Sequence, residues 1–156
     1  MSRPGDPAPG TLAALQTTLA AEHAAVWVLG VLGGRTSASR SGSLYAAISA
    51  AYVAHRSRRD QLTSTIRDLG SDPVASAAAY DLPRPIEGPG PSDRQLAAAA
   101  LEVEQRCAAT YAFLVAQTSG RERGWAIRAL NEAAVRELAF RGTPEMFPGA
   151  DEYADR

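Results

Sequence analysis

A glutamate interrupts an apolar helical stripe near the start of this 156-residue chain. The stripe has the alternating spacing of three and four residues that marks heptad a and d positions, and it consists of Leu12, Leu15, Leu19, Glu22, Val26, Leu29 and Gly33. A carboxylate at this position faces other helices rather than water. Burial of a charge is costly unless the charge is paired or binds a metal. Glu22 therefore predicts a polar cluster or a metal site inside a helix bundle.

Three later segments also place polar residues on apolar stripes. The second stripe carries His55 and Arg59 and comprises Tyr45, Ile48, Tyr52, His55, Arg59, Leu62, Ile66 and Leu69. The third contains Glu104 among Leu96, Ala100, Leu101, Ala108, Tyr111, Leu114 and Val115. The fourth contains Asn131, followed by Glu132, among Ile127, Ala134 and Leu138. Each of four segments thus brings a polar group near its midpoint, which is what a site inside a bundle needs.

A buried ion-pair network is the chemistry that we favour for these residues. Its members are Glu22, His55, Arg58, Arg59 and Glu104. An arginine can serve two carboxylates at once, and His55 can bridge them. Such a network fixes helix register while adding little net stability.

A metal centre is the first alternative, with Glu22, His55 and Glu104 holding iron or manganese in a redox enzyme. A di-iron bundle takes a Glu from two helices and a Glu-x-x-His motif from each of the other two. Here the second segment has Arg58 three residues after His55, and the fourth has Val135 three residues after Glu132. This departure favours a protein that is not an enzyme and has no cofactor. A pocket for a small ligand or a protein partner is the second alternative.

The overall composition argues against several classes of partner. The net charge is −1, from 16 basic and 17 acidic residues, so neither nucleic acid nor an anionic membrane is expected as a partner. The longest apolar run, 24–32, is short for a membrane span, and no signal peptide precedes it, so we expect a cytoplasmic protein. Cys107 is the single cysteine, and we interpret it as a buried, inert thiol.

Glycine, proline and capping residues divide the chain into four predicted helices. Residues 1–10 are predicted to be disordered, 11–149 to form the domain, and 150–156 to be a tail, with Met146, Phe147 and Tyr153 near the end available to pin the chain to the bundle. The predicted helices are 11–32, capped by Thr11 and ended by Gly33 and Gly34; 43–69, capped by Ser43; 92–118, with Ser92 and Gln95 as a capping box; and 121–141. A short helix is also predicted over 73–80.

Two short breaks and one long connection describe the order of these helices. The connection, 71–91, contains Pro83, Pro85, Pro89 and Pro91, which exclude regular structure. A four-helix bundle with one long crossover between helices 2 and 3 is the ferritin-like topology, and it is the fold that we predict. An up-down bundle with a local loop is the alternative.

Several short motifs, in this order and spacing, resemble an actinobacterial ferritin-like domain family of unknown function. They are Ala-Ala-Glu-His-Ala-Ala-Val at 20–26, His-Arg-Ser-Arg-Arg-Asp at 55–60, Ala-Tyr-Asp-Leu-Pro at 79–83, Glu104 with Cys-Ala-Ala-Thr-Tyr at 107–111, and Phe-Pro-Gly at 147–149. The resemblance covers about 11–149. It implies a four-helix ferritin-like bundle, often a homodimer, with no established activity, and it assigns no catalytic residues here.

Overall fold

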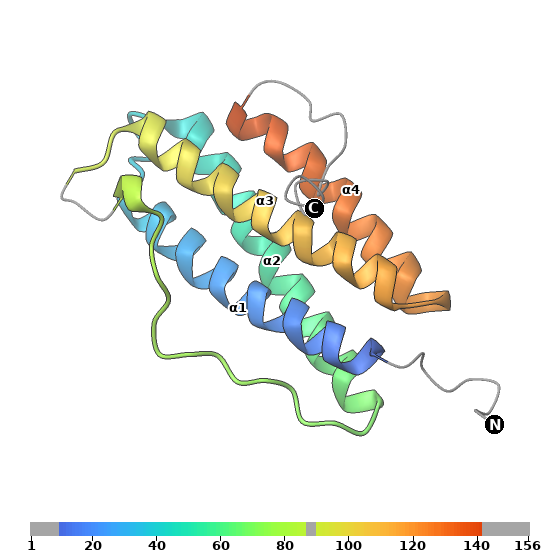
Figure 1. Ribbon diagram of the computed structural model, residues 1–156. Coiled ribbons are helices and arrows are strands. Elements are labelled where there is room, and N and C mark those ends of the chain that lie inside the picture. Colours follow the sequence, from blue (N-terminus) through green and yellow to red (C-terminus); the bar gives the residue numbers. More distant parts are fainter. Residues whose placement is uncertain (1–9, 87–89, 142–156) are drawn as a thin grey trace, which may run out of the picture.

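Four long helices form the protein in a computed structural model, which describes residues 10–86 and 90–141. The helices are α1 (Thr11–Arg35), α2 (Gly42–Asp68), α3 (Asp93–Gln117) and α4 (Gly120–Arg141), and the described residues form no strand (Figure 1). The predicted all-α four-helix bundle is thus confirmed. The predictions for residues 1–9 and for the tail lie outside the described residues.

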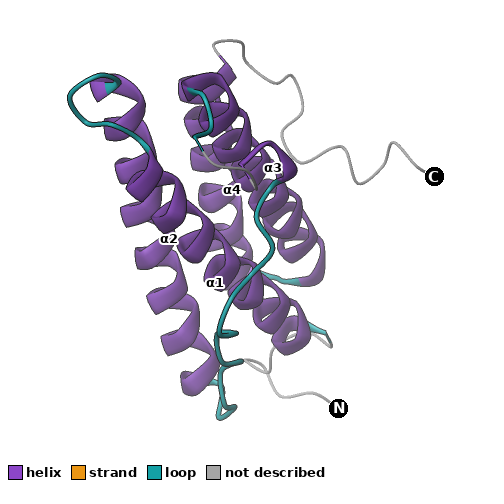
Figure 2. Cartoon of the chain, turned by 90° about the vertical axis from the view of Figure 1, so that its left-hand side faces the viewer, coloured by secondary structure: helices purple, strands orange, loops and turns teal. Residues whose placement is uncertain are grey.

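The connection from α2 to α3 crosses the bundle from one end to the other. The Thr11 hydroxyl, at the start of α1, donates to the carbonyl of Gln117 at the end of α3, at 3.3 Å. Ser41, just before α2, donates to Asp93 at the start of α3. Therefore α1 and α3 run antiparallel, whereas α2 and α3 start at the same end. Figures 1 and 2 show the connection returning along the outside of α1, which confirms the predicted long crossover.

Side chains of α1 hold this crossover in place. The Gln16 amide donates to the Asp72 carbonyl at 2.7 Å and accepts from the Val74 amide at 2.8 Å. His23 Nε2 lies 3.1 Å from the Val74 carbonyl oxygen. The helix predicted over 73–80 is wrong, and the segment has no regular structure. The backbone groups of Asp72 and Val74 form hydrogen bonds with side chains of α1 instead. One short 3-10 helix (Arg84–Ile86) follows in the crossover, just before residues 87–89.

Some helix ends differ from the predicted ones. Thr11 and Ser43 lie inside their helices, and α1 continues through Gly33 and Gly34 to Arg35. Gly70, at φ +76°, follows α2 in the left-handed conformation that glycine favours.

The α3 capping box is confirmed, and it carries a stability prediction. The Ser92 hydroxyl accepts from the Gln95 amide, while the Gln95 side chain accepts from the Ser92 amide. We expect Ser92→Ala to lower the free energy of unfolding by about 1 kcal/mol in urea titrations. Ser43→Ala, on the exposed side of α2, is the control and should change it by less than about 0.5 kcal/mol. Equal effects would contradict the capping role.

The helices bury faces that differ in part from the predicted stripes. Leu12 of α1 and Tyr45 of α2 are exposed, and Tyr52 is half-buried. The stripe predicted for α4 is wrong, since Ile127, Asn131 and Leu138 face outward. The buried side chains of that helix include Ala126, Ala129, Ala133 and Glu137. Small alanine side chains let α4 lie close against α3, while several larger apolar residues, Ile127, Val135 and Leu138, are left at the surface.

The α1 helix is the single described helix that is long and apolar enough to cross a membrane by length and composition. Our expectation from the run 24–32 alone was that no segment would reach this length. Its leucines at 15, 19, 29 and 32 are nevertheless buried against the other helices. Core helices of globular bundles meet the same criterion, so the α1 composition agrees with its place in the core.

Candidate functional site

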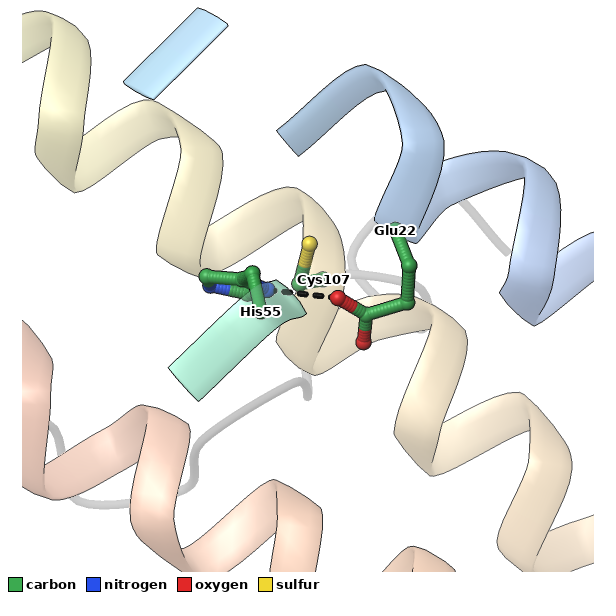
Figure 3. Close-up of side chains that lie close together, drawn as sticks. All are labelled: Glu22, His55 and Cys107. Atoms are coloured by element: carbon green, nitrogen blue, oxygen red, sulfur yellow. Dashed lines mark hydrogen bonds and ion pairs between the residues drawn. The ribbon is translucent and has the colours of Figure 1, made fainter. Parts of the chain in front are cut away.

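Glu22, His55 and Glu104 meet at mid-height in the bundle, from α1, α2 and α3. All three side chains are fully buried. His55 Nδ1 lies 2.7 Å from Glu22 Oε2, and His55 Nε2 lies 3.3 Å from Glu104 Oε1. Figure 3 shows His55 pointing its ring at the Glu22 carboxylate, with the Cys107 thiol alongside. A histidine between two carboxylates is best satisfied as an imidazolium, because both ring nitrogens then donate.

A second branch of the network links Glu22 to the surface. The Tyr111 hydroxyl donates to Glu22 Oε1 and accepts from Arg58 Nη1 at 3.0 Å. Arg58 Nη2 donates to the Ala129 carbonyl at 3.2 Å and to Glu132 Oε2 at 2.7 Å. The guanidinium also lies over the Tyr111 ring, 4.9 Å from its centroid. Arg58 and Glu132 line a cavity of about 310 Å³ between α2 and α4.

Arg136 of α4 completes the network on the side of Glu104. Its Nε donates to Glu104 Oε1 at 2.9 Å. Glu104 Oε2 and Arg136 Nη2 are buried and form no hydrogen bond with the described residues. With ionised carboxylates and a protonated His55, three acidic groups (Glu22, Glu104, Glu132) balance three basic groups (His55, Arg58, Arg136).

The protonation states follow from this arrangement. Burial lowers the pKa of His55, but contacts with the neighbouring side chains of Cys107, Glu104 and Glu22 outweigh burial and raise it well above its usual range. Burial raises the pKa of Glu104, but His55 and Arg136 outweigh this effect, and the net pKa is lowered. Burial and the Glu22 carboxylate raise the pKa of Tyr111 well above its usual range, so its hydroxyl remains a donor. The site is therefore an imidazolium bridging two helices through carboxylates.

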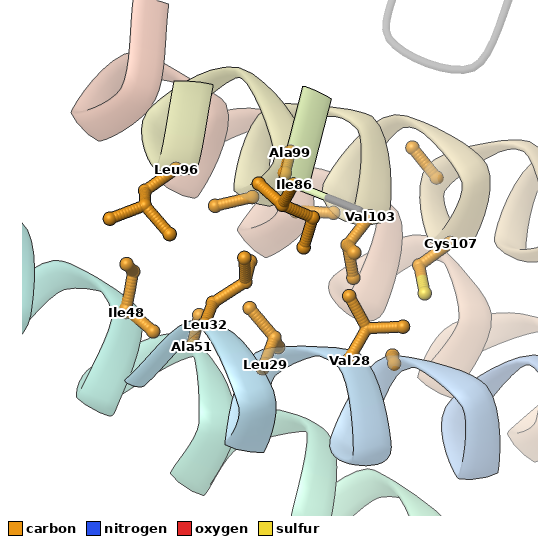
Figure 4. Close-up of a cluster of buried hydrophobic side chains, with 14 of the residues drawn as sticks. Val28, Leu29, Leu32, Ile48, Ala51, Ile86, Leu96, Ala99, Val103 and Cys107 are labelled. Atoms are coloured by element: carbon orange, nitrogen blue, oxygen red, sulfur yellow. The ribbon is translucent and has the colours of Figure 1, made fainter. Parts of the chain in front are cut away.

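Cys107 belongs both to the edge of this network and to the apolar core. Figure 4 shows its side chain beside Val28 and Val103. Burial raises the pKa of the thiol, which is neutral at ordinary pH. Donor atoms of Glu22, His55 and Cys107 all lie within 4.8 Å of one another, a group that could hold one metal ion. This set differs from the predicted ligands, because Cys107 takes the place of Glu104.

The structure brings together four of the five residues that we assigned to the polar cluster. Glu22, His55, Arg58 and Glu104 are joined as described above. Arg59 is a correction, since it lies outside the cluster and donates to Asp60 at 2.7 Å. The reason is helical phase: the buried face of α2 turns from His55 to Arg58, three residues on, rather than to Arg59. Neither arginine bonds a core carboxylate directly, because Tyr111 stands between Arg58 and Glu22.

Sequence reasoning missed Arg136 and Glu137, which α4 places on its inner side. Asn131 and Glu132, which we expected there, are exposed, although the Glu132 carboxylate reaches Arg58. The signal that was available is the spacing of Ala126, Ala129, Ala133 and Glu137 along one face. Alanine carries too little apolar area to make such a face stand out against isoleucine and leucine.

Comparison with known proteins gives a family and a fold without a function. No curated protein matches the chain. The crystal structure of a conserved hypothetical protein, rv2844, from Mycobacterium tuberculosis is similar, with 25% sequence identity, a TM-score of 0.76 and coverage of 86% of this chain and 96% of that one. A model of the family described as a domain of unknown function (DUF4439) matches residues 14–152. The chain therefore belongs to the DUF4439 family.

Proposed function

We propose that the protein is a non-catalytic, cytoplasmic ferritin-like domain whose buried network is structural. The observation that carries this proposal is His55, which has a carboxylate of a different helix at each ring nitrogen, at 2.7 Å and 3.3 Å. Such a bridge ties α1, α2 and α3 together at one height. A shift of any one of these three helices by one turn would break at least one of these charged hydrogen bonds, so the bridge selects one register of α1, α2 and α3.

The donor set does not fit a pair of iron or manganese ions. A di-iron bundle takes a Glu from two helices and a Glu-x-x-His motif from each of the other two, whereas here α2 supplies His55 with Arg58, and α4 supplies Arg136. Each guanidinium is a permanent positive charge that would repel a cation. The three acidic and three basic groups that are joined by hydrogen bonds in the network also balance in charge. These features support a structural role over redox chemistry of the ferritin-like kind.

The proposal predicts that Glu104→Gln will change stability and not activity. The variant keeps the side-chain shape but removes the charge that faces both His55 and Arg136. We expect the free energy of unfolding to fall by about 2–4 kcal/mol in urea titrations. Aerobic oxidation of iron(II), followed by absorbance, should proceed at the buffer rate with either protein. Oxidation by the wild type that Glu104→Gln abolishes would overturn the proposal.

A single divalent metal is the second candidate, and the thiol favours it. Thiolate, imidazole and carboxylate together suit Zn²⁺ better than iron or manganese. Binding would require loss of the protons on Cys107 and His55, which the raised pKa values of both groups oppose. We therefore expect far less than one metal per chain after dialysis against Zn²⁺, Fe²⁺ or Mn²⁺ and elemental analysis. One tightly held ion per chain that Cys107→Ser releases would establish the metal site instead.

A further inference from the structure

A pocket of about 540 Å³ lies between α1, α2 and the crossover, apart from the buried network. Helix α1 supplies His23, Val26, Trp27, Gly30 and Val31, α2 supplies Tyr52 and Arg59, and the crossover supplies Ser76, Ala77 and Tyr80. Figure 2 shows the crossover passing over α1, and three of its residues line the pocket. Small-molecule sites in proteins have this size and are lined mainly by apolar and aromatic groups.

Three aromatic residues, Trp27, Tyr52 and Tyr80, line this pocket. Trp27 of α1 and Tyr80 of the crossover are tilted by 58° to each other, with centroids 6.1 Å apart. Tyr52 stands on the α2 side, where a Cβ added at Gly30 would lie 3.6 Å from its ring. Glycine at position 30 thus leaves the space beside the Tyr52 ring open. All three aromatic side chains are only partly buried, so each has ring surface available to a flat ligand.

The charge of the lining is positive. None of its ten residues is acidic, and Arg59 carries a permanent charge. Arg59 donates through Nε and Nη2 to Asp60, whose side chain is 63% exposed and lies outside the pocket. Its Nη1 donates to none of the described residues. An exposed ion pair between neighbouring residues is weak, so a ligand anion can compete for this guanidinium.

Neighbouring polar residues of α1 and α2 point to two different places because consecutive residues of a helix face different directions. Glu22 and Arg58 point into the buried network, while His23 and Arg59, the next residues, line the pocket. Each of these two pairs therefore contributes one residue to the buried network and one to the pocket. The crossover is fixed over the pocket by Gln16 at one end and by Arg35, which donates to the Ile86 carbonyl, at the other.

From this geometry we infer that the pocket beneath the crossover binds a small planar aromatic molecule that carries a carboxylate or another anionic group. The ring lies among Trp27, Tyr52 and Tyr80, and the anion accepts from Arg59. The inference does not depend on the role of the buried network, because the two sites share no residue.

Binding of 2-naphthoate and of its neutral analogue 2-naphthamide, measured by titration calorimetry, tests this inference. The wild type should bind the acid about tenfold more tightly than the amide, the difference that one charge-assisted hydrogen bond supplies. Arg59→Gln should bring the two affinities together. Arg67→Gln, an exposed arginine two turns further along α2, should leave the preference unchanged.

A second variant tests the pocket itself. Gly30→Leu should abolish binding of both compounds, because its side chain extends into the space beside Tyr52, while circular dichroism verifies that the variant is folded. Absence of saturable binding to the wild type at millimolar ligand, equal affinity for acid and amide, or unchanged binding in a folded Gly30→Leu protein would each overturn the inference.

Discussion

Glu22→Ala should lower the free energy of unfolding by about 3–5 kcal/mol, the range seen when one partner of a buried ion pair is removed. The substitution takes away the carboxylate that accepts from both His55 and Tyr111. It leaves an imidazolium without one of its acceptors and a buried hydroxyl without its acceptor, at a place where water does not reach. A loss of this size is a large fraction of the stability of a typical domain.

A glutamate that forms an exposed ion pair provides the matched control for this variant. Glu102 of α3 pairs with Arg106 at 2.7 Å, and the side chains are 38% and 72% exposed. Glu102→Ala should change the free energy of unfolding by less than about 1 kcal/mol. Both variants are compared by urea unfolding followed by circular dichroism. If Glu22→Ala were no more harmful than Glu102→Ala, the role we assign to the buried network would be wrong.

The first three helices and their polar interruptions were predictable because their periodicity is strong. Leucine and isoleucine at three- and four-residue spacing define the buried faces around Glu22 and His55. The capping box at Ser92 fixes where α3 begins, and the prolines before it require a long connection. These are local signals, and each one can be read without knowing what the segment packs against.

The α4 helix shows where this reading fails. Its inner face consists largely of alanine, so hydrophobicity points to the wrong side of the helix and hides Arg136. The choice between Arg58 and Arg59 also depends on tertiary context, because after His55 both a three- and a four-residue step keep to one face. The length of the crossover was predictable from its prolines. Its hydrogen bonds to Gln16 and His23 were not, because these residues are distant in sequence, and the segment forms these bonds instead of the predicted short helix.

The protonated His55 makes stability depend on pH in a window where few other groups titrate. The pKa of His55 is raised in the folded protein, so the folded state holds a proton that the unfolded chain releases near pH 6.5. Its contribution is fully present below that pH and is lost as the pH rises through the folded pKa. Between these limits the free energy of unfolding should fall by about 1.4 kcal/mol per pH unit.

Comparison of slopes in variants separates this contribution from the rest of the chain. Urea unfolding is measured at about pH 6.5, 7.2 and 8.0. These values lie at or above the ordinary pKa of histidine and below the ordinary pKa of cysteine. His55→Gln should flatten the dependence, whatever its cost in absolute stability, because the group that holds the extra proton is gone. His23→Gln removes the other histidine, which lies on the crossover side of α1, and should retain the wild-type slope. An identical slope in wild type and His55→Gln would mean that His55 is neutral in the fold. The bridge would then lack the positive charge that pairs with both carboxylates. A neutral imidazole is also the form that binds a metal, so this result would favour a metal site at Glu22, His55 and Cys107.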